Sequence, residues 1–142
     1  MGWFFNKAKT NYVGEMRECV KDFMLRYIKE FPSSGDVVIP IFSEAEQMIR
    51  GLSEKEVSKM MKDNHVNVEC GALNIIQNFA MTNLKPKSAV DFLKGSDDDA
   101  LKLYNYVNQY KYDKGYITKQ QFEENKSLGT KLSLQSPLGG WF

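Results

Sequence analysis

The chain has little excess charge of either sign. In 142 residues, 19 Lys and Arg nearly balance 18 Asp and Glu, which leaves a net charge of +1. No global field therefore draws this protein toward nucleic acid or an anionic membrane. A nucleic-acid-associated helical regulator would need a local basic patch, for which Lys85, Lys87 and Lys111 are the candidates. The composition argues against that function, which we keep as an alternative.

Cysteine and histidine are also scarce, since the chain contains only Cys19, Cys70 and His65. A structural zinc site needs four ligands, so these residues alone do not form one. The two cysteines lie far apart in the sequence and predict buried, reduced thiols in a cytoplasmic protein. A nucleophilic thiol would also need an orienting group and a cleft, so a small enzyme with a site near Glu69, Cys70 and His65 is a second alternative. We predict no catalytic residue, no cofactor and no metal.

Long apolar runs are missing, which argues against a transmembrane segment and a signal peptide. Trp3, Phe4 and Phe5 form only a short aromatic cluster at the N-terminus. Asn6 stands where an N-myristoylation motif needs Ser or Thr. The three rings could make a weak membrane contact beside Lys7, although we expect them to dock on the helical core.

Most of the chain has apolar residues at helical spacing. This pattern predicts an all-α fold, an irregular bundle of about six to seven helices within a single domain over residues 1–142. We expect helices over residues 7–31, 43–50, 53–64, 68–84, 88–94, 96–112 and 118–128. Residues 36–42 are the exception, because Pro40 in the run DVVIPIF favours a short extended segment. Val68–Leu84 is the most apolar helix, expected at the centre of the packing, and Gly71 within it would permit a close helix crossing.

The last two helices are expected to form a hairpin over residues 97–129. Gly115 permits the turn between them, and Thr118 begins the second helix with a capping box. Tyr106 and Tyr112 fall outside the apolar face of the first helix. We predict that they are exposed phenols that contact a partner.

The turn and second helix of this hairpin carry a recognisable motif, Gly-x-Ile-Thr-x-x-x-Phe-Glu. Its residues are Gly115, Ile117, Thr118, Phe122 and Glu123. Together with the surrounding residues 101–129, the motif resembles the SHOCT domain, a short two-helix domain usually found at the termini of bacterial proteins. The resemblance implies a bacterial source and a role in oligomerisation or partner docking. It transfers no catalytic residue.

Residues 130–142 are predicted to form an extended tail, because Pro137 and the glycines after it do not sustain a helix. Trp141 and Phe142 at its end could fold back on the domain or contact a neighbour. The leading hypothesis is a non-catalytic protein–protein interaction or assembly protein whose partner is another protein or a second copy. Its possible partner contacts are Tyr106, Tyr112, Trp141 and Phe142.

Overall fold

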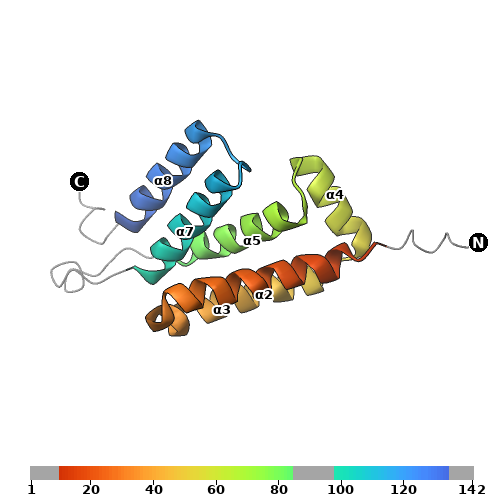
Figure 1. Cartoon of the computed structure of the whole chain (residues 1–142), viewed down its shortest axis with the longest axis horizontal. Coiled ribbons are helices and arrows are strands. Elements are labelled where there is room, and N and C mark those ends of the chain that lie inside the picture. Colours follow the sequence, from red (N-terminus) through yellow and green to blue (C-terminus); the bar gives the residue numbers. More distant parts are fainter. Residues whose placement is uncertain (1–9, 85–97, 135–142) are drawn as a thin grey trace, which may run out of the picture.

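The computed structural model describes residues 10–84 and 98–134. Its described part is a helical bundle, so the predicted all-α fold is confirmed (Figure 1). The helices are α2 (Tyr12–Glu30), α3 (Gly35–Arg50), α4 (Glu54–Asn64), α5 (Val68–Thr82), α7 (Asp99–Asp113) and α8 (Lys119–Leu134), with a 3-10 turn, η1 (Pro32–Ser34). None of the described helices is long and apolar enough to cross a membrane.

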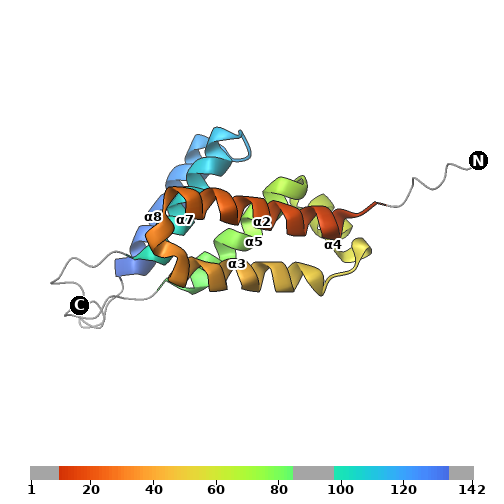
Figure 2. The same ribbon diagram turned by 60° about the horizontal axis from the view of Figure 1, so that its bottom comes forward.

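The described bundle consists of two helical hairpins, α2–α3 and α7–α8, and of helices α4 and α5, which connect them in the sequence. Helices α2 and α3 lie side by side, and α5 packs against both of them (Figure 2). Helix α7 packs on α5 and carries α8 on its outer side, whereas α4 lies toward the other end of α5 (Figure 1). Helix α5 therefore contacts both hairpins, which agrees with the central place predicted for this segment.

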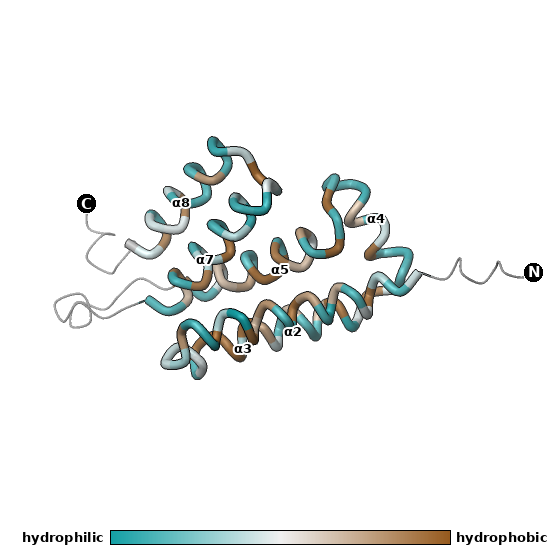
Figure 3. The backbone as a smooth tube through the Cα atoms, in the orientation of Figure 1, coloured by the Kyte–Doolittle hydropathy of each residue, from teal (hydrophilic) through white to brown (hydrophobic). Residues whose placement is uncertain are grey.

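The hydrophobic core is formed by buried residues of α2, α3, α4, α5 and α7. Figure 3 shows hydrophobic positions, in brown, recurring along the helices. The core residues recur every three or four residues on α2, α3, α5 and α7, which is the spacing of one helical face. From α2 come Met16, Val20, Phe23 and Tyr27, and from α5 come Ala72, Leu73, Ile75, Ile76 and Ala80. One face of α2 is thus buried along most of its length.

Gly71 of α5 lies against the side chain of Met16 on α2. A Cβ atom on Gly71 would lie 2.8 Å from Cε of Met16, which is fully buried. The glycine leaves room for the methionine side chain, whereas the close helix crossing predicted at Gly71 stays a prediction.

Residues 36–42 are helical, so the extended segment predicted there is wrong. They belong to α3, which runs without a break from Gly35 to Arg50, and no separate helix begins at residue 43. Pro40 lies inside α3 and is exposed, so the missing backbone donor faces away from the core. Burial of Val38, Ile41, Phe42, Ala45 and Ile49 along one helical face outweighs the loss of one helix hydrogen bond.

Two helix boundaries also differ from the expected ones. Helix α2 begins at Tyr12, because the side chain of Asn11 accepts a hydrogen bond from the Gly14 N–H at 3.2 Å and caps the helix. Helix α8 continues through Leu134, so the tail predicted from residue 130 is wrong over 130–134. Ser133 Oγ donates to Asp98 Oδ2 at 3.0 Å and holds this last turn against the start of α7.

Some of the predicted features lie outside the described residues. These are the aromatic cluster Trp3, Phe4 and Phe5, the basic residues Lys85 and Lys87, the helix over 88–94, and the aromatic residues Trp141 and Phe142.

Candidate functional site: the α2–α5 groove

Glu69 joins the first turn of α5 to the α7–α8 hairpin. Asn67 caps α5 by accepting from the Cys70 N–H at 2.8 Å, which fixes the first turn and the Glu69 side chain on it. The Glu69 carboxylate accepts hydrogen bonds from the hydroxyls of Tyr110, at 3.1 Å, and Tyr116. Lys114 Nζ lies 3.6 Å from the same carboxylate.

These contacts decide the charge of Glu69. Burial raises the pKa of its carboxyl group, but the hydrogen bonds from Tyr116 and Tyr110 and the ammonium of Lys114 lower the pKa by more. The net result is a pKa below the ordinary glutamate value. Glu69 is therefore ionised at neutral pH and has its own cation beside it.

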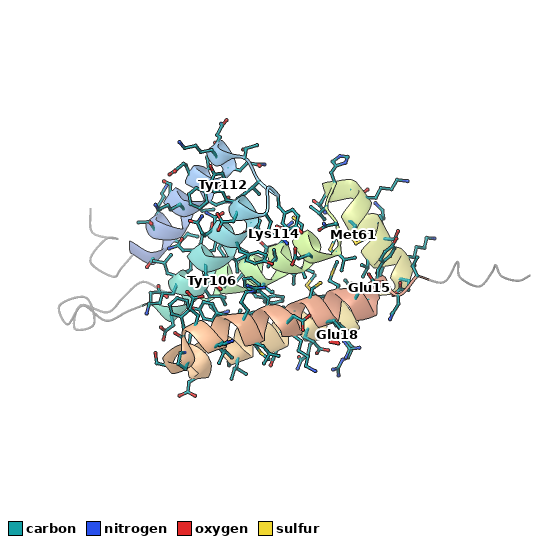
Figure 4. The ribbon with its side chains drawn as sticks, viewed as in Figure 1. Glu15, Glu18, Met61, Tyr106, Tyr112 and Lys114 are labelled. Atoms are coloured by element: carbon teal, nitrogen blue, oxygen red, sulfur yellow. The ribbon has the colours of Figure 1, made fainter. Side chains whose placement is uncertain are left out.

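An open groove lies between α2 and the first turns of α5. It consists of two adjoining hollows of about 690 and 210 Å³, which share Cys19 and Glu69. We call it the α2–α5 groove and define it by Glu15, Glu18, Cys19, Asp22, Val68 and Glu69. Figure 4 labels Glu15 and Glu18 on α2, and Lys114 near the opposite wall.

The wider hollow of the α2–α5 groove is lined mainly by apolar surface, whereas the narrower hollow exposes more polar than apolar surface. Phe23 and Leu73 line the narrower end and are 5% and 1% exposed, and Val68 lines the wider end half-buried. The ring of Phe23 is held by edge-to-face contact with Tyr110, whose centroid lies 5.2 Å away. The apolar surface open to a partner therefore lies mainly in the wider hollow, between α2 and the first turn of α5.

The α2 rim of the groove is acidic. Glu15, Glu18 and Asp22 are exposed on α2, and none of them forms an ion pair with any described residue. Burial raises the pKa of the Cys19 thiol, and the negative charges of Glu69 and of these three carboxylates raise it further. The thiol in the groove is therefore held in its protonated form.

Arg26 is the cation of this rim. It follows Asp22 by one helical turn, and its guanidinium carbon lies 5.3 Å from the centre of the Tyr110 ring. The rim therefore carries negative charge along most of its length and one positive charge at the end nearest α7.

The opposite side of α2 is different. There a hollow of about 530 Å³ lies between α2 and α3 and includes Glu46. Glu46 accepts hydrogen bonds from Arg17 Nε at 2.6 Å and Arg50 Nη2 at 2.9 Å, and these contacts lower the pKa of its carboxyl group. Glu46 on this side is thus paired with two arginines, in contrast to Glu15 and Asp22 of the α2–α5 groove, whereas Glu18 lines both hollows.

The three residues considered for an enzyme site occupy different environments. His65 is exposed at the end of α4 in the left-handed conformation, with a φ of 55°. Cys70 is only 4% exposed, and burial raises the pKa of its thiol, with Lys111 lowering it and Glu69 raising it again. Glu69 is engaged by tyrosines and Lys114, so the described contacts join it to the hairpin and not to His65.

The two tyrosines predicted to be exposed are both half-buried, which corrects that expectation. The ring of Tyr106 packs edge-to-face on Tyr27 and Phe31, with centroids 5.1 and 5.8 Å away, and its hydroxyl donates to Glu30 Oε2 at 3.0 Å. The ring of Tyr112 stacks on Phe122 at 4.8 Å. Both side chains serve the packing of α7, and a further contact of either with a partner stays a prediction.

The acidic rim was not identified from the sequence. A signal was present, because Glu15, Glu18 and Asp22 follow each other at intervals of three and four residues and so share one helical face. The opposite wall, which begins at Val68, is too distant in the sequence for any local pattern to indicate.

The geometry defines a class of protein: an all-α bundle with an apolar, acid-rimmed groove between two of its helices. Among the residues that the structure describes, no group of three His, Cys, Asp or Glu side chains is placed to hold a metal ion. Comparison with protein-family models gave no match, and comparisons with curated proteins and with solved structures gave none either.

Proposed function

We propose that this chain is a non-catalytic protein-binding module that accepts its partner in the α2–α5 groove. One observation carries the proposal: the groove combines an apolar base with a rim of carboxylates that have no partner among the described residues. Stable protein interfaces have this composition, with an apolar centre that excludes water and a polar margin that selects the partner.

The two alternatives have less support. A thiol-dependent enzyme needs a thiolate, yet the pKa values of Cys19 and Cys70 are both raised. A nucleic-acid regulator needs exposed cations, yet Lys111 is 5% exposed and its Nζ donates to Gln77 Oε1 at 2.7 Å. Phosphates would also be repelled by the carboxylates along the groove.

The resemblance of residues 101–129 to the SHOCT domain supports the same proposal. If it holds, the chain is a bacterial, cytoplasmic protein whose C-terminal hairpin assists assembly. The turn of this hairpin adjoins the groove, because Tyr110 and Tyr116 both donate to Glu69. A partner in the groove would then lie next to the hairpin.

Site-specific photo-crosslinking in the cell tests this function. Glu15, on the groove rim, and Glu44, exposed on α3, would each be replaced by p-benzoyl-phenylalanine in the full chain. We expect one defined protein adduct from position 15 and none from position 44, with the same adduct suppressed by Val68→Asp. Equal adducts or no adduct at both positions, with a monomer in light scattering, would overturn the proposal.

A further inference from the structure

We infer that the occupant of the α2–α5 groove is a cationic amphipathic helix of another protein, with Lys or Arg residues along one edge of an apolar face. This inference rests on the proposed function and specifies the chemistry of the partner. It follows from the dimensions of the groove, the spacing of its charges and the position of its one guanidinium.

The groove is long enough for a helix. Its lining extends along α2 from Asn11 to Arg26, which corresponds to about 22 Å at 1.5 Å per residue. This length equals about four helical turns of 5.4 Å. An apolar base between two helices is the setting in which amphipathic helices commonly dock, with apolar residues at intervals of three and four.

The spacing of the acids matches such a helix. Glu15, Glu18 and Asp22 repeat at three and four residues along α2. Lys or Arg residues at the same intervals on the partner would lie opposite them when the two helices run side by side. Unlike Glu46 and Glu69, these acids have no cation from the described residues, so a partner would not first have to break an ion pair.

The position of Arg26 indicates which way a docked helix would run along α2. Arg26 stands beyond Asp22, so the rim is negative toward Asn11 and positive at its other end. A docked helix would place an acidic residue or its negative C-terminal end near Arg26. The inferred partner is therefore basic along one edge, with the opposite charge at one end.

The closing experiment uses the full chain and a defined probe. The probe is a fluorescein-labelled 15-residue peptide of Leu and Lys whose lysines follow one helical edge. Its two controls are a scrambled peptide of equal composition and the same pattern with Glu for Lys. Fluorescence anisotropy at low and at physiological salt gives the affinities, because the inferred electrostatic contacts are screened by salt.

Matched variants locate the binding. Glu15→Gln with Asp22→Asn removes two charges from the groove, whereas Glu44→Gln with Glu123→Gln removes two exposed charges elsewhere. We expect binding of the patterned peptide to weaken about tenfold in the groove variant and less than about twofold in the control. Circular dichroism spectra would confirm that both variants keep the helical fold.

Cys19 provides an independent readout of occupancy. It lies in the groove, whereas Cys70, the other cysteine of the chain, is buried in the core. The patterned peptide should slow alkylation of Cys19 by N-ethylmaleimide, followed by peptide mass spectrometry, and the scrambled peptide should not. The alternative result is that Cys19 is protected from alkylation in the free chain and becomes reactive when residues 1–9 are deleted. That result would show that the chain fills its own groove, and it would overturn the inference.

Equal binding of the patterned and scrambled peptides, or equal loss in the groove and control variants, would also overturn it. The same holds if no Leu–Lys peptide binds. Failure of the inference is distinct from failure of the proposed function, because a crosslinked partner at position 15 would still support a protein-binding groove that prefers a different chemistry.

Discussion

The ring of Tyr104 lies directly against Gly129, so that a Cβ atom on this glycine would stand 2.5 Å from Tyr104 Cε1. The hydroxyl of the same tyrosine donates to the backbone carbonyl of Asn125 at 2.8 Å, one turn earlier on α8. Asn108 Nδ2 donates to the backbone carbonyl of Phe122 at 2.9 Å, a further turn toward the start of α8. These contacts set the distance between α7 and α8.

Gly129→Ala should therefore destabilise the protein, although alanine favours helix more than glycine does. A methyl group at position 129 would meet the Tyr104 ring, which is fixed by its own backbone and by its hydrogen bond to Asn125. Such overpacking costs about 1–3 kcal/mol. The measurement is the free energy of unfolding from urea denaturation.

Gly71→Ala is the matched control for this prediction. Its methyl group would meet the flexible end of Met16, which can move, so the gain in helix propensity should keep the net change within about 1 kcal/mol. An equal or larger loss for Gly71→Ala would contradict the argument that the rigidity of Tyr104 decides the difference.

Glu69→Gln should change how stability depends on pH. The pKa of Glu69 is lowered in the folded state, so its ionised form adds stability above the unfolded glutamate pKa. That contribution is lost as the pH falls through the folded value. The wild type should therefore be more stable than Glu69→Gln at pH 7, and the difference should shrink below about pH 4.5.

Urea denaturation at intervals of pH would measure this difference. Glu44→Gln, an exposed glutamate on α3, controls for the general effect of removing a negative charge. A difference between wild type and Glu69→Gln that stayed constant from neutral to acid pH would show that the tyrosine and lysine contacts do not hold the charged form.

Tyr106→Ser should destabilise the fold, whereas the same substitution of an exposed tyrosine would have little effect on stability. Its ring packs on Phe23, Tyr27 and Phe31, and removing a half-buried aromatic side chain from such a cluster costs about 2–4 kcal/mol. Tyr106→Phe keeps the ring and loses only the exposed hydrogen bond to Glu30, at a cost below about 1 kcal/mol.

Thermal unfolding of the two variants separates these effects. If Tyr106→Ser were as stable as Tyr106→Phe, the ring cluster would contribute little, and the original assignment of Tyr106 to a contact surface would regain support. Tyr112→Ser leaves this cluster intact and is the better variant for testing association.

Local hydrogen-bonding patterns were the most predictable part of the fold. The capping box of Ser53 and Glu56 is present, with both of its hydrogen bonds, at 2.8 and 3.1 Å. The box of Thr118 and Gln121 is also present, at 2.9 and 3.1 Å. Such pairs are set by residues three positions apart. The pattern alone does not suffice, however, because Ser43 and Glu46 share it and lie inside α3, where Glu46 accepts from Arg17 and Arg50.

Features decided by tertiary packing were missed. The run DVVIPIF fits a strand and a buried helix equally well by composition, and only burial of Val38, Ile41 and Phe42 against α2 and α5 favours the helix. The α2–α5 groove depends on Glu69 and Val68 coming to lie beside α2. No local spacing in the sequence indicates that these two residues lie beside α2, although the acidic stripe of α2 itself is visible in the sequence.

Lys111 gives the last prediction, because it is a buried cation that forms no ion pair with a carboxylate of residues 10–84 or 98–134. It is 5% exposed, and its Nζ donates to Gln77 Oε1 at 2.7 Å. Burial lowers the pKa of Lys111, with Cys70 raising it slightly in return. Since the folded pKa lies below the unfolded value, the unfolded chain binds more protons between the two, and stability should rise with pH over that interval.

Lys111→Met combined with Gln77→Leu removes both polar partners and keeps the volume of the site, so the pH-dependent contribution should disappear. As the pH rises toward the unfolded lysine pKa of 10.5, the wild type should gain stability relative to this double variant, as measured by urea denaturation. Lys62→Met, at an exposed lysine on α4, should leave the slope unchanged. If the wild type and the double variant keep a constant difference over this interval, Lys111 is as well solvated in the folded protein as in the unfolded chain, and its burial carries no electrostatic cost.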